Sequence, residues 1–163
     1  MRTIMIAGLA ILIAACGGSE QPSAGMSNEE VAAGVEDMLQ GWAATGSEGR
    51  WSDLNAFYAT DPGFRWIELG RVAYTSADEI ENGLNTLGQI NASMSSRIDN
   101  VSVAPLGPGA AAFTANLAVD FTSDQFSYAF DGVISGVAVN KDGAWKFLQG
   151  HISAPPQNEA AEE

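Results

Sequence analysis

Cysteine, histidine and basic residues are scarce in this chain. Its 163 residues include one cysteine, one histidine and 7 lysines or arginines, against 20 acidic residues, so the formal net charge is −13. One cysteine excludes an internal disulfide framework and any cysteine-rich zinc or iron–sulfur site, and one histidine excludes a histidine-rich metal site. An acidic surface repels phosphate, which argues against nucleic-acid binding. Nucleotide-binding, zinc-protease and serine-hydrolase motifs are missing as well, so we predict no metal and no cofactor.

The first 15 residues have the pattern of a secretory signal, since Arg2 precedes an apolar run over residues 4–15. As a helix this run would span about 18 Å, too short for a hydrocarbon core of about 30 Å, which disfavours a permanent transmembrane helix. Ile13-Ala14-Ala15-Cys16 resembles the lipobox of bacterial lipoproteins. The resemblance implies cleavage before Cys16 and acylation of its sulfur and its new amino terminus. An ordinary signal peptide that ends near a cysteine is the alternative.

A tether and a tail flank the predicted domain. Residues 16–26 are rich in glycine and serine and predict a flexible tether from a lipidated Cys16. Gly17 stands where an aspartate typically retains such proteins at the inner membrane, so the resemblance favours the outer membrane, facing the periplasm. We predict one domain over residues 27–154, followed by a disordered acidic tail over residues 155–163.

Helices are predicted early in the domain and strands late. Two capping boxes, Ser27-Asn28-Glu29-Glu30 and Ser76-Ala77-Asp78-Glu79, open helices that end near Gly46 and Leu87. A short helix is predicted between them, and the expected strands cover residues 64–69, 95–103, 110–122, 126–139 and 144–153. Helices that precede antiparallel strands indicate an α+β fold.

Three residue patterns, taken with this order of elements, carry a resemblance. They are Tyr58-x-x-Asp61-Pro62-x-Phe64-x-Trp66, then Gly70 with Ser76-x-x-Glu79-Ile80, then Asp142-Gly143-x-Trp145-Lys146-Phe147-x-Gln149-Gly150-His151-x-Ser153. Together they resemble the SnoaL-like branch (DUF4440 type) of the NTF2-like superfamily. The resemblance implies an NTF2-like cone, with three helices of the N-terminal half packed on a strongly curved, mainly antiparallel sheet. It also implies an open end that leads to a pocket and, in many members, a homodimer formed through the sheet.

His151 is the first candidate site residue. By the two-residue period of a strand it shares a face with Trp145, Phe147, Gln149 and Ser153. Imidazole titrates near neutral pH, so His151 could act as a general acid or base, although a structural histidine is the alternative. Many family members have His-x-His here. Gln149 replaces the first histidine, which argues against paired-imidazole chemistry and metal binding.

Glu68 and Trp66 lie on one face of the predicted first strand. If this face lines the cone, Trp66 forms a wall and Glu68 is a buried carboxylate with a raised pKa. Otherwise Trp66 belongs to the core and Glu68 is solvated at the strand end. Tyr58 and Tyr74 are expected to place a hydroxyl in a cavity, whereas Trp42 is expected in the core.

Asp120 lies on the polar side of its predicted strand. It could line a pocket or belong to a solvated outer face of the sheet. Asp131 and Arg97 carry the same ambiguity, with a cross-strand ion pair as the simpler explanation.

We interpret the chain as an envelope lipoprotein whose domain binds a small, partly apolar ligand in a cone-shaped pocket. One alternative is a lyase, isomerase or hydrolase with His151 as general acid or base, and another is a non-catalytic dimeric interaction module. The candidate catalytic residues are His151 and Glu68, and the candidate ligand-binding residues are Tyr58, Trp66, Tyr74, Asp120 and Gln149.

Overall fold

The computed structural model describes residues 25–68 and 70–155. Along the chain lie α1 (Asn28–Ser47), the 3-10 helix η1 (Trp51–Phe57), β1 (Arg65–Glu68), β2 (Arg71–Tyr74), α2 (Ala77–Gln89), β3 (Ser93–Gly107), β4 (Ala110–Thr122), β5 (Ser127–Lys141) and β6 (Ala144–Ser153). The predicted signal peptide, Cys16, most of the tether and most of the tail lie outside the described residues. No helix within the described ranges is long and apolar enough to cross a membrane.

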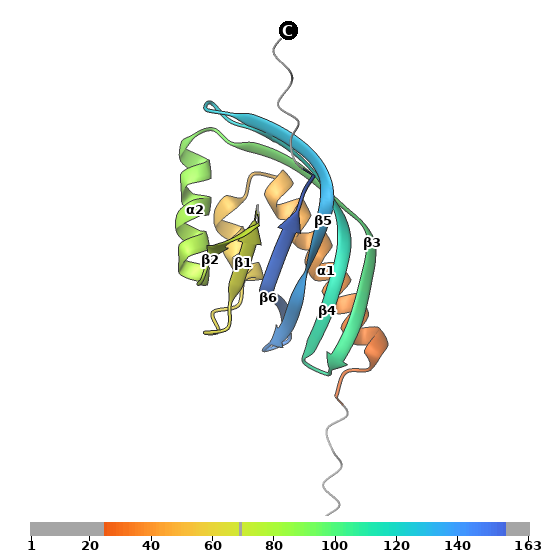
Figure 1. Cartoon of the computed structure of the whole chain (residues 1–163). Helices are drawn as coiled ribbons and strands as arrows, with labels where there is room; N and C mark the ends of the chain where they lie inside the picture. Colours follow the sequence, from red (N-terminus) through yellow and green to blue (C-terminus); the bar gives the residue numbers. More distant parts are fainter. Residues whose placement is uncertain (1–24, 69, 156–163) are drawn as a thin grey trace, which may run out of the picture.

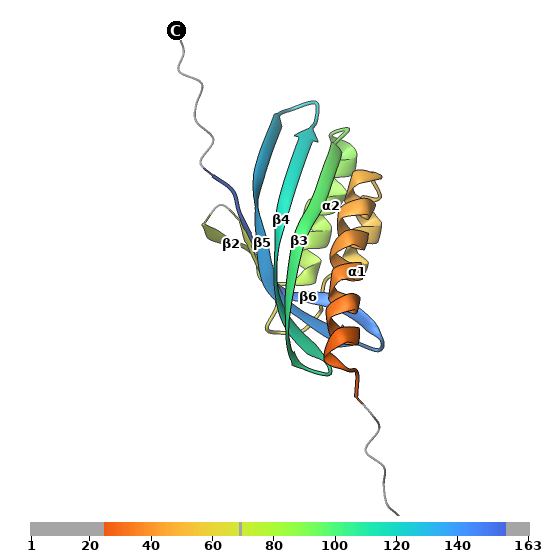
Figure 2. The same cartoon turned by 90° about the vertical axis from the view of Figure 1, so that its right-hand side faces the viewer.

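Six strands form one curved sheet in the order β2-β1-β6-β5-β4-β3 (Figure 1). β1 and β6 pair in parallel, and the other neighbours pair antiparallel. Figure 2 shows α1 and α2 on the same side of the sheet. The predicted α+β fold, with helices on a strongly curved and mainly antiparallel sheet, is therefore confirmed. The short strand β2 was not predicted.

Side-chain caps begin both α-helices, as predicted. Ser27 Oγ accepts from the Glu30 backbone N–H at 3.2 Å, and Glu30 accepts from the Ser27 N–H at 2.7 Å. At α2, Ser76 Oγ accepts from the Glu79 N–H at 3.3 Å, but Glu79 reaches one residue further back, to the Thr75 N–H. These backbone hydrogen bonds stabilise the ionised carboxylates, so the pKa values of Glu30 and Glu79 are lowered.

The concave face of the sheet, which the helices cover, is called the inner face, and the opposite one the outer face. In β4 the inner residues from Ala111 to Phe121 are buried at every second position, while most of the alternate ones are exposed. At the narrow end of the cone, six buried aromatic rings pack with centroid distances of 5.3–6.1 Å. They belong to Trp42, Tyr58, Phe64, Trp66, Phe113 and Phe147. The interior is filled at this end.

Candidate functional site

The outer face of the sheet carries His151 and Gln149. In the register of β6 with β5, Gln149 lies opposite Val137 and His151 opposite Ser135, whereas Phe147 lies opposite the buried Ala138. The strand β6 thus contains one extra residue, a β-bulge, between Phe147 and Gln149. A bulge reverses which side chains face inward, so the expected common face from Trp145 to Ser153 is wrong.

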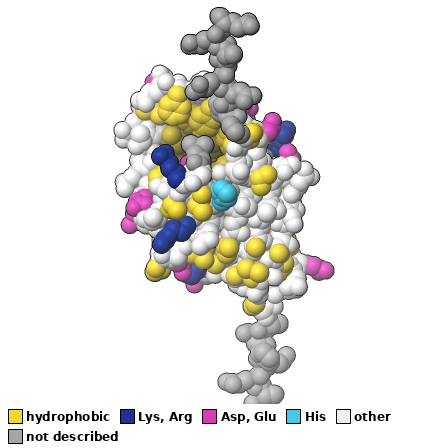
Figure 3. All heavy atoms as spheres, viewed as in Figure 1, with side chains coloured by type: hydrophobic (Ala, Val, Ile, Leu, Met, Phe, Trp, Pro, Cys, Tyr) yellow, Lys and Arg dark blue, Asp and Glu magenta, His cyan; other side chains and the backbone are white. Residues whose placement is uncertain are grey.

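The His151 side chain consequently lies at the surface, where Figure 3 shows it. Within the described residues it takes part in no hydrogen bond and no ion pair. Its neighbours across the sheet are Ser135 on β5 and Ile67 on β1.

Glu68 and Trp66 face the interior. Trp66 is 2% exposed, and its indole Nε1 donates to Glu68 Oε1 at 2.5 Å. Glu68 is partly buried at the end of β1. Since Ile67, the residue beside His151, alternates with Glu68, the carboxylate and the imidazole lie on opposite faces. The two candidate catalytic residues do not meet.

Tyr58 and Tyr74 differ in their surroundings. Tyr58 is buried in the core, where its hydroxyl accepts a hydrogen bond of 2.9 Å from Trp42 Nε1, so no cavity receives it. Burial, reinforced by the charge of Glu68, raises the pKa of Tyr58 far above its usual value. Tyr74 is only partly buried on β2, and its hydroxyl lies against Gly83 of α2. Burial and the charge of Glu68 also raise the pKa of Tyr74.

A second aromatic cluster lies on the β4–β5 hairpin, at the wide end of the cone. Phe121, Phe126, Tyr128 and Phe130 stack with ring centroids 5.0–6.2 Å apart and interplanar angles of 10–16°. Phe126 is 49% exposed and Tyr128 37% exposed. In Figure 3 hydrophobic side chains gather around a depression in the upper part of the surface.

The hairpin tip is fixed against the end of α2. The Asp124 backbone N–H donates to the Ile90 carbonyl at 3.2 Å, and Asn91 Nδ2 donates to the Asp124 carboxylate at 2.5 Å. Figure 1 shows the tip curving over the inner face towards α2. The stacked rings are thereby held over the interior.

Glu68 of β1 lies on the same inner face of the sheet as this cluster, opposite Ile152 of β6. Burial and the negative charge of Glu68 raise the pKa of Tyr128, as they do that of Tyr74. The carboxylate therefore lies within electrostatic range of both hydroxyls. We call this set of inner-face residues the aromatic mouth: Glu68, Tyr74, Phe121, Phe126, Tyr128 and Phe130.

Sequence reasoning found only part of the aromatic mouth. It named Glu68 and Tyr74 but missed the four stacked rings. Phe126, Tyr128 and Phe130 recur at every second residue, which places them on one face of a strand and was the available signal.

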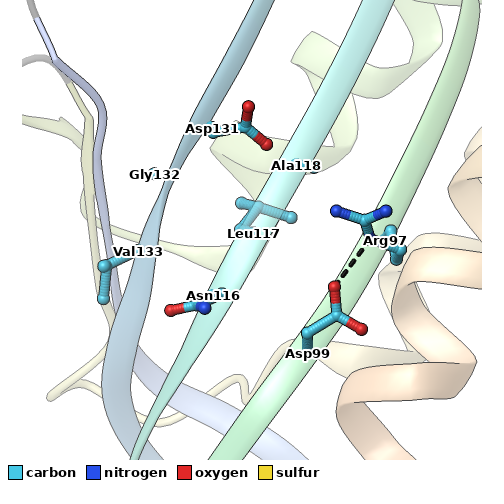
Figure 4. A pocket seen from close by; sticks show the side chains of 8 residues that line it. All are labelled: Arg97, Asp99, Asn116, Leu117, Ala118, Asp131, Gly132 and Val133. Atoms are coloured by element: carbon cyan, nitrogen blue, oxygen red, sulfur yellow. Dashed lines mark ion pairs between the residues drawn. The ribbon is translucent and has the colours of Figure 1, made fainter.

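The outer face carries a shallow groove of about 440 Å³, drawn in Figure 4. Arg97 Nε lies 2.6 Å from Asp99 Oδ2, so its ion pair is formed within β3 and not with Asp131 across the sheet. Asp120 also lies on this face, exposed between Ser95 and Ala129. The predicted ligand-binding residues therefore do not form one site. Asp120 and Gln149 lie on the outer face of the sheet, and Tyr58, Trp66 and Tyr74 lie on the inner face.

Comparison with known protein families gives a match over most of the chain. The family model of the SnoaL-like domain matches residues 35–157. The chain belongs to the SnoaL-like family. Within its described residues, this SnoaL-like domain has no group of three or more histidine, cysteine, aspartate or glutamate side chains that could hold a metal ion.

Solved structures share the SnoaL-like fold at low sequence identity. A proposed scytalone dehydratase from Novosphingobium aromaticivorans has a TM-score of 0.67 at 16% identity, covering 76% of this chain and 83% of its own. An NTF2-like superfamily protein from Salmonella enterica serovar Typhimurium also has a TM-score of 0.67, at 13% identity, covering 84% and 99%. No curated protein matches the sequence. At these identities the neighbours support the fold alone.

Proposed function

We propose that this SnoaL-like protein binds a small, largely apolar ligand at its aromatic mouth while a lipid on Cys16 anchors it to the cell envelope. The observation that carries the proposal is the row of stacked rings on the inner face, of which Phe126 and Tyr128 stay 49% and 37% exposed. Large exposed apolar groups that lie side by side mark binding surfaces more often than isolated ones do.

The polar groups of the aromatic mouth support a ligand site. Ligand pockets are mostly apolar and contain a few polar atoms that orient the bound molecule. Within the described residues, the hydroxyls of Tyr74 and Tyr128 and the Oε2 atom of Glu68 form no hydrogen bond. These three atoms are available to a ligand.

Binding without catalysis is the function that the geometry supports best. General acid–base catalysis requires the two groups to reach the same substrate, at about 3 Å from the transferred proton. His151 and Glu68 lie on opposite faces of the sheet. A ligand in the aromatic mouth would contact the carboxylate but not the imidazole.

Native mass spectrometry of the protein purified from its own cells tests the proposal. We expect a bound small molecule that is released on denaturation and is lost in Phe126→Ala and Tyr128→Ala. His151→Ala should retain it, because His151 lies on the other face. The proposal fails if the wild type releases no small molecule, or if His151→Ala loses the molecule while both aromatic variants keep it.

The lipid anchor is proposed from the lipobox-like residues 13–16 and the tether that follows them. Several acyl chains on one cysteine give stable membrane attachment, whereas one chain gives marginal binding. Cys16→Ser should move the protein from the membrane fraction to the soluble periplasmic fraction. Continued sedimentation of that variant with the outer membrane would contradict the anchor.

A homodimer through the outer face is a second candidate function. None of the described helices covers this face, and it presents small apolar residues such as Ala118 and Val133, the latter 42% exposed. Sedimentation velocity should show a dimer that Val133→Lys dissociates. Ala33→Lys is the control, because this exposed alanine lies on α1, on the other side of the sheet. A monomeric wild type would exclude this candidate.

A further inference from the structure

The aromatic mouth presents negative electrostatic potential. The faces of aromatic rings carry partial negative charge, and Phe121, Phe126, Tyr128 and Phe130 lie with their planes within 16° of one another where they stack. Glu68 adds a carboxylate on the same face of the sheet. Asp124 lies at the hairpin tip beside them.

Among the residues that the structure describes, no cation pairs with the Glu68 carboxylate. One of its oxygens accepts from Trp66 Nε1, a neutral donor. Arg71 lies opposite Glu68 in the β1–β2 register but is exposed, and within the described residues it forms no ion pair. Arg71 is thus the basic side chain at the rim of the aromatic mouth.

Most other described basic side chains are engaged elsewhere. Arg50, Arg97 and Lys141 form ion pairs with Asp53, Asp99 and Asp61. Arg65 Nη1 donates to backbone carbonyls, including that of Thr75. Lys146 lies opposite Val139, near the β5–β6 turn. None of these groups is placed to neutralise Glu68.

We propose that the aromatic mouth selects an organic cation, namely a protonated amine or a quaternary ammonium group carried on a flat or apolar body. The inference rests on the proposed function and specifies its ligand class. Electron-rich ring faces attract cations within about 6 Å of their centroids, and aromatic groups of this kind are known to bind quaternary ammonium ions. The carboxylate strengthens the attraction where water is partly excluded.

Other ligand classes fit the aromatic mouth less well. An anionic ligand would be repelled by Glu68 and by a chain of net charge −13, and among the described basic side chains the exposed Arg71 alone is placed to attract it. A neutral ligand could stack on the rings and donate a hydrogen bond to Glu68 Oε2, but it would gain no charge attraction. The three classes therefore rank in affinity as cation, neutral molecule and anion.

Ligand-observed NMR with three probes tests this ranking on the purified full-length protein. 2-Phenylethylammonium, 2-phenylethanol and phenylacetate share a similar body and differ in charge. We expect the ammonium compound to bind roughly tenfold more tightly than the alcohol, and phenylacetate to bind most weakly. Added salt should weaken the binding of the cation and leave that of the alcohol unchanged.

Charge-removing variants locate the effect. Glu68→Gln should reduce the affinity for the cation roughly tenfold and preserve that for the alcohol. Glu36→Gln, an exposed site on α1, is the matched control and should change neither. Arg71→Gln should increase the affinity for the cation. Should Glu68→Gln not fold, the salt dependence and Arg71→Gln still test the charge preference.

The outcomes separate this inference from the proposed function. Equal affinities for the three probes would overturn the cation preference and leave an apolar binding site intact. Tightest binding of phenylacetate, lost in Arg71→Gln, would overturn it in favour of an anion. If the folded wild type binds none of the probes and releases no small molecule from cells, both proposals fail.

Discussion

The two aromatic clusters of this domain contain similar residue types but differ in ring packing and in exposure. At the narrow end, the rings of Trp42, Tyr58, Trp66 and Phe147 meet at angles up to 85°, are nearly fully buried, and the Tyr58 hydroxyl accepts from an indole N–H. In the aromatic mouth the rings are nearly parallel and partly exposed, and the tyrosine hydroxyls have no partner within the described residues. Tilted, interlocked rings close a core, whereas parallel rings leave a flat face accessible.

The largest expected effect comes from truncating a ring in each cluster. Phe147 is fully buried, so Phe147→Ala should lower the free energy of unfolding by about 3–5 kcal/mol. Phe126→Ala should cost less than about 1 kcal/mol because half of that ring is exposed. Urea denaturation followed by circular dichroism measures both values. Similar losses from the two variants would show that the hairpin rings belong to the core.

A smaller loss of stability should follow from adding a side chain at Gly150, where β6 closely approaches the ring of Trp66. A Cβ atom on Gly150 would collide with the ring of Trp66, so Gly150→Ala should destabilise the domain by about 1–3 kcal/mol. Gly109→Ala is the control, since a Cβ there meets no atom within 4 Å. Thermal unfolding compares the two. An unchanged thermal unfolding midpoint for Gly150→Ala would contradict close packing of β6 against Trp66 at the narrow end.

Removing a tyrosine hydroxyl should affect stability differently in the two clusters. Tyr58→Phe leaves Trp42 Nε1 buried without an acceptor and should cost about 1–3 kcal/mol. Tyr128→Phe removes a hydroxyl without a protein partner and should stay within about 0.5 kcal/mol of the wild type. Chemical denaturation again gives both numbers, and equal costs would contradict the distinction between the clusters.

Local signals predicted much of this fold. The cap residues Ser27 and Ser76 marked the starts of α1 and α2, and the alternation from Phe113 to Phe121 identified β4 and its inner face. These features depend on neighbours along the chain. The four-residue strand β2 was missed, since a run so short has no clear period and forms by pairing with β1.

The candidate site was predicted less well because it depends on distant contacts. The two-residue period placed His151 inside, but one bulged residue in β6 put it outside. The alternation of Phe126, Tyr128 and Phe130 would have given their common face, but it was not used. Their exposure, however, follows from a hairpin held by Ile90 and Asn91, far away in sequence.

The smallest expected effect is a shift in tyrosine titration, which all three tyrosines of the chain report. Absorbance should show Tyr74 and Tyr128 ionising above the usual value near 10, and Tyr58 remaining neutral until the domain unfolds. Since the unfolded chain loses these protons first, stability should fall as the pH rises above about 10. Glu68→Gln should lower the pKa values of Tyr74 and Tyr128, because it removes the charge that helps to raise them. Unchanged pKa values of both tyrosines in that variant would show that the Glu68 charge does not act on them. Glu68 and the stacked rings would then not belong to one aromatic mouth.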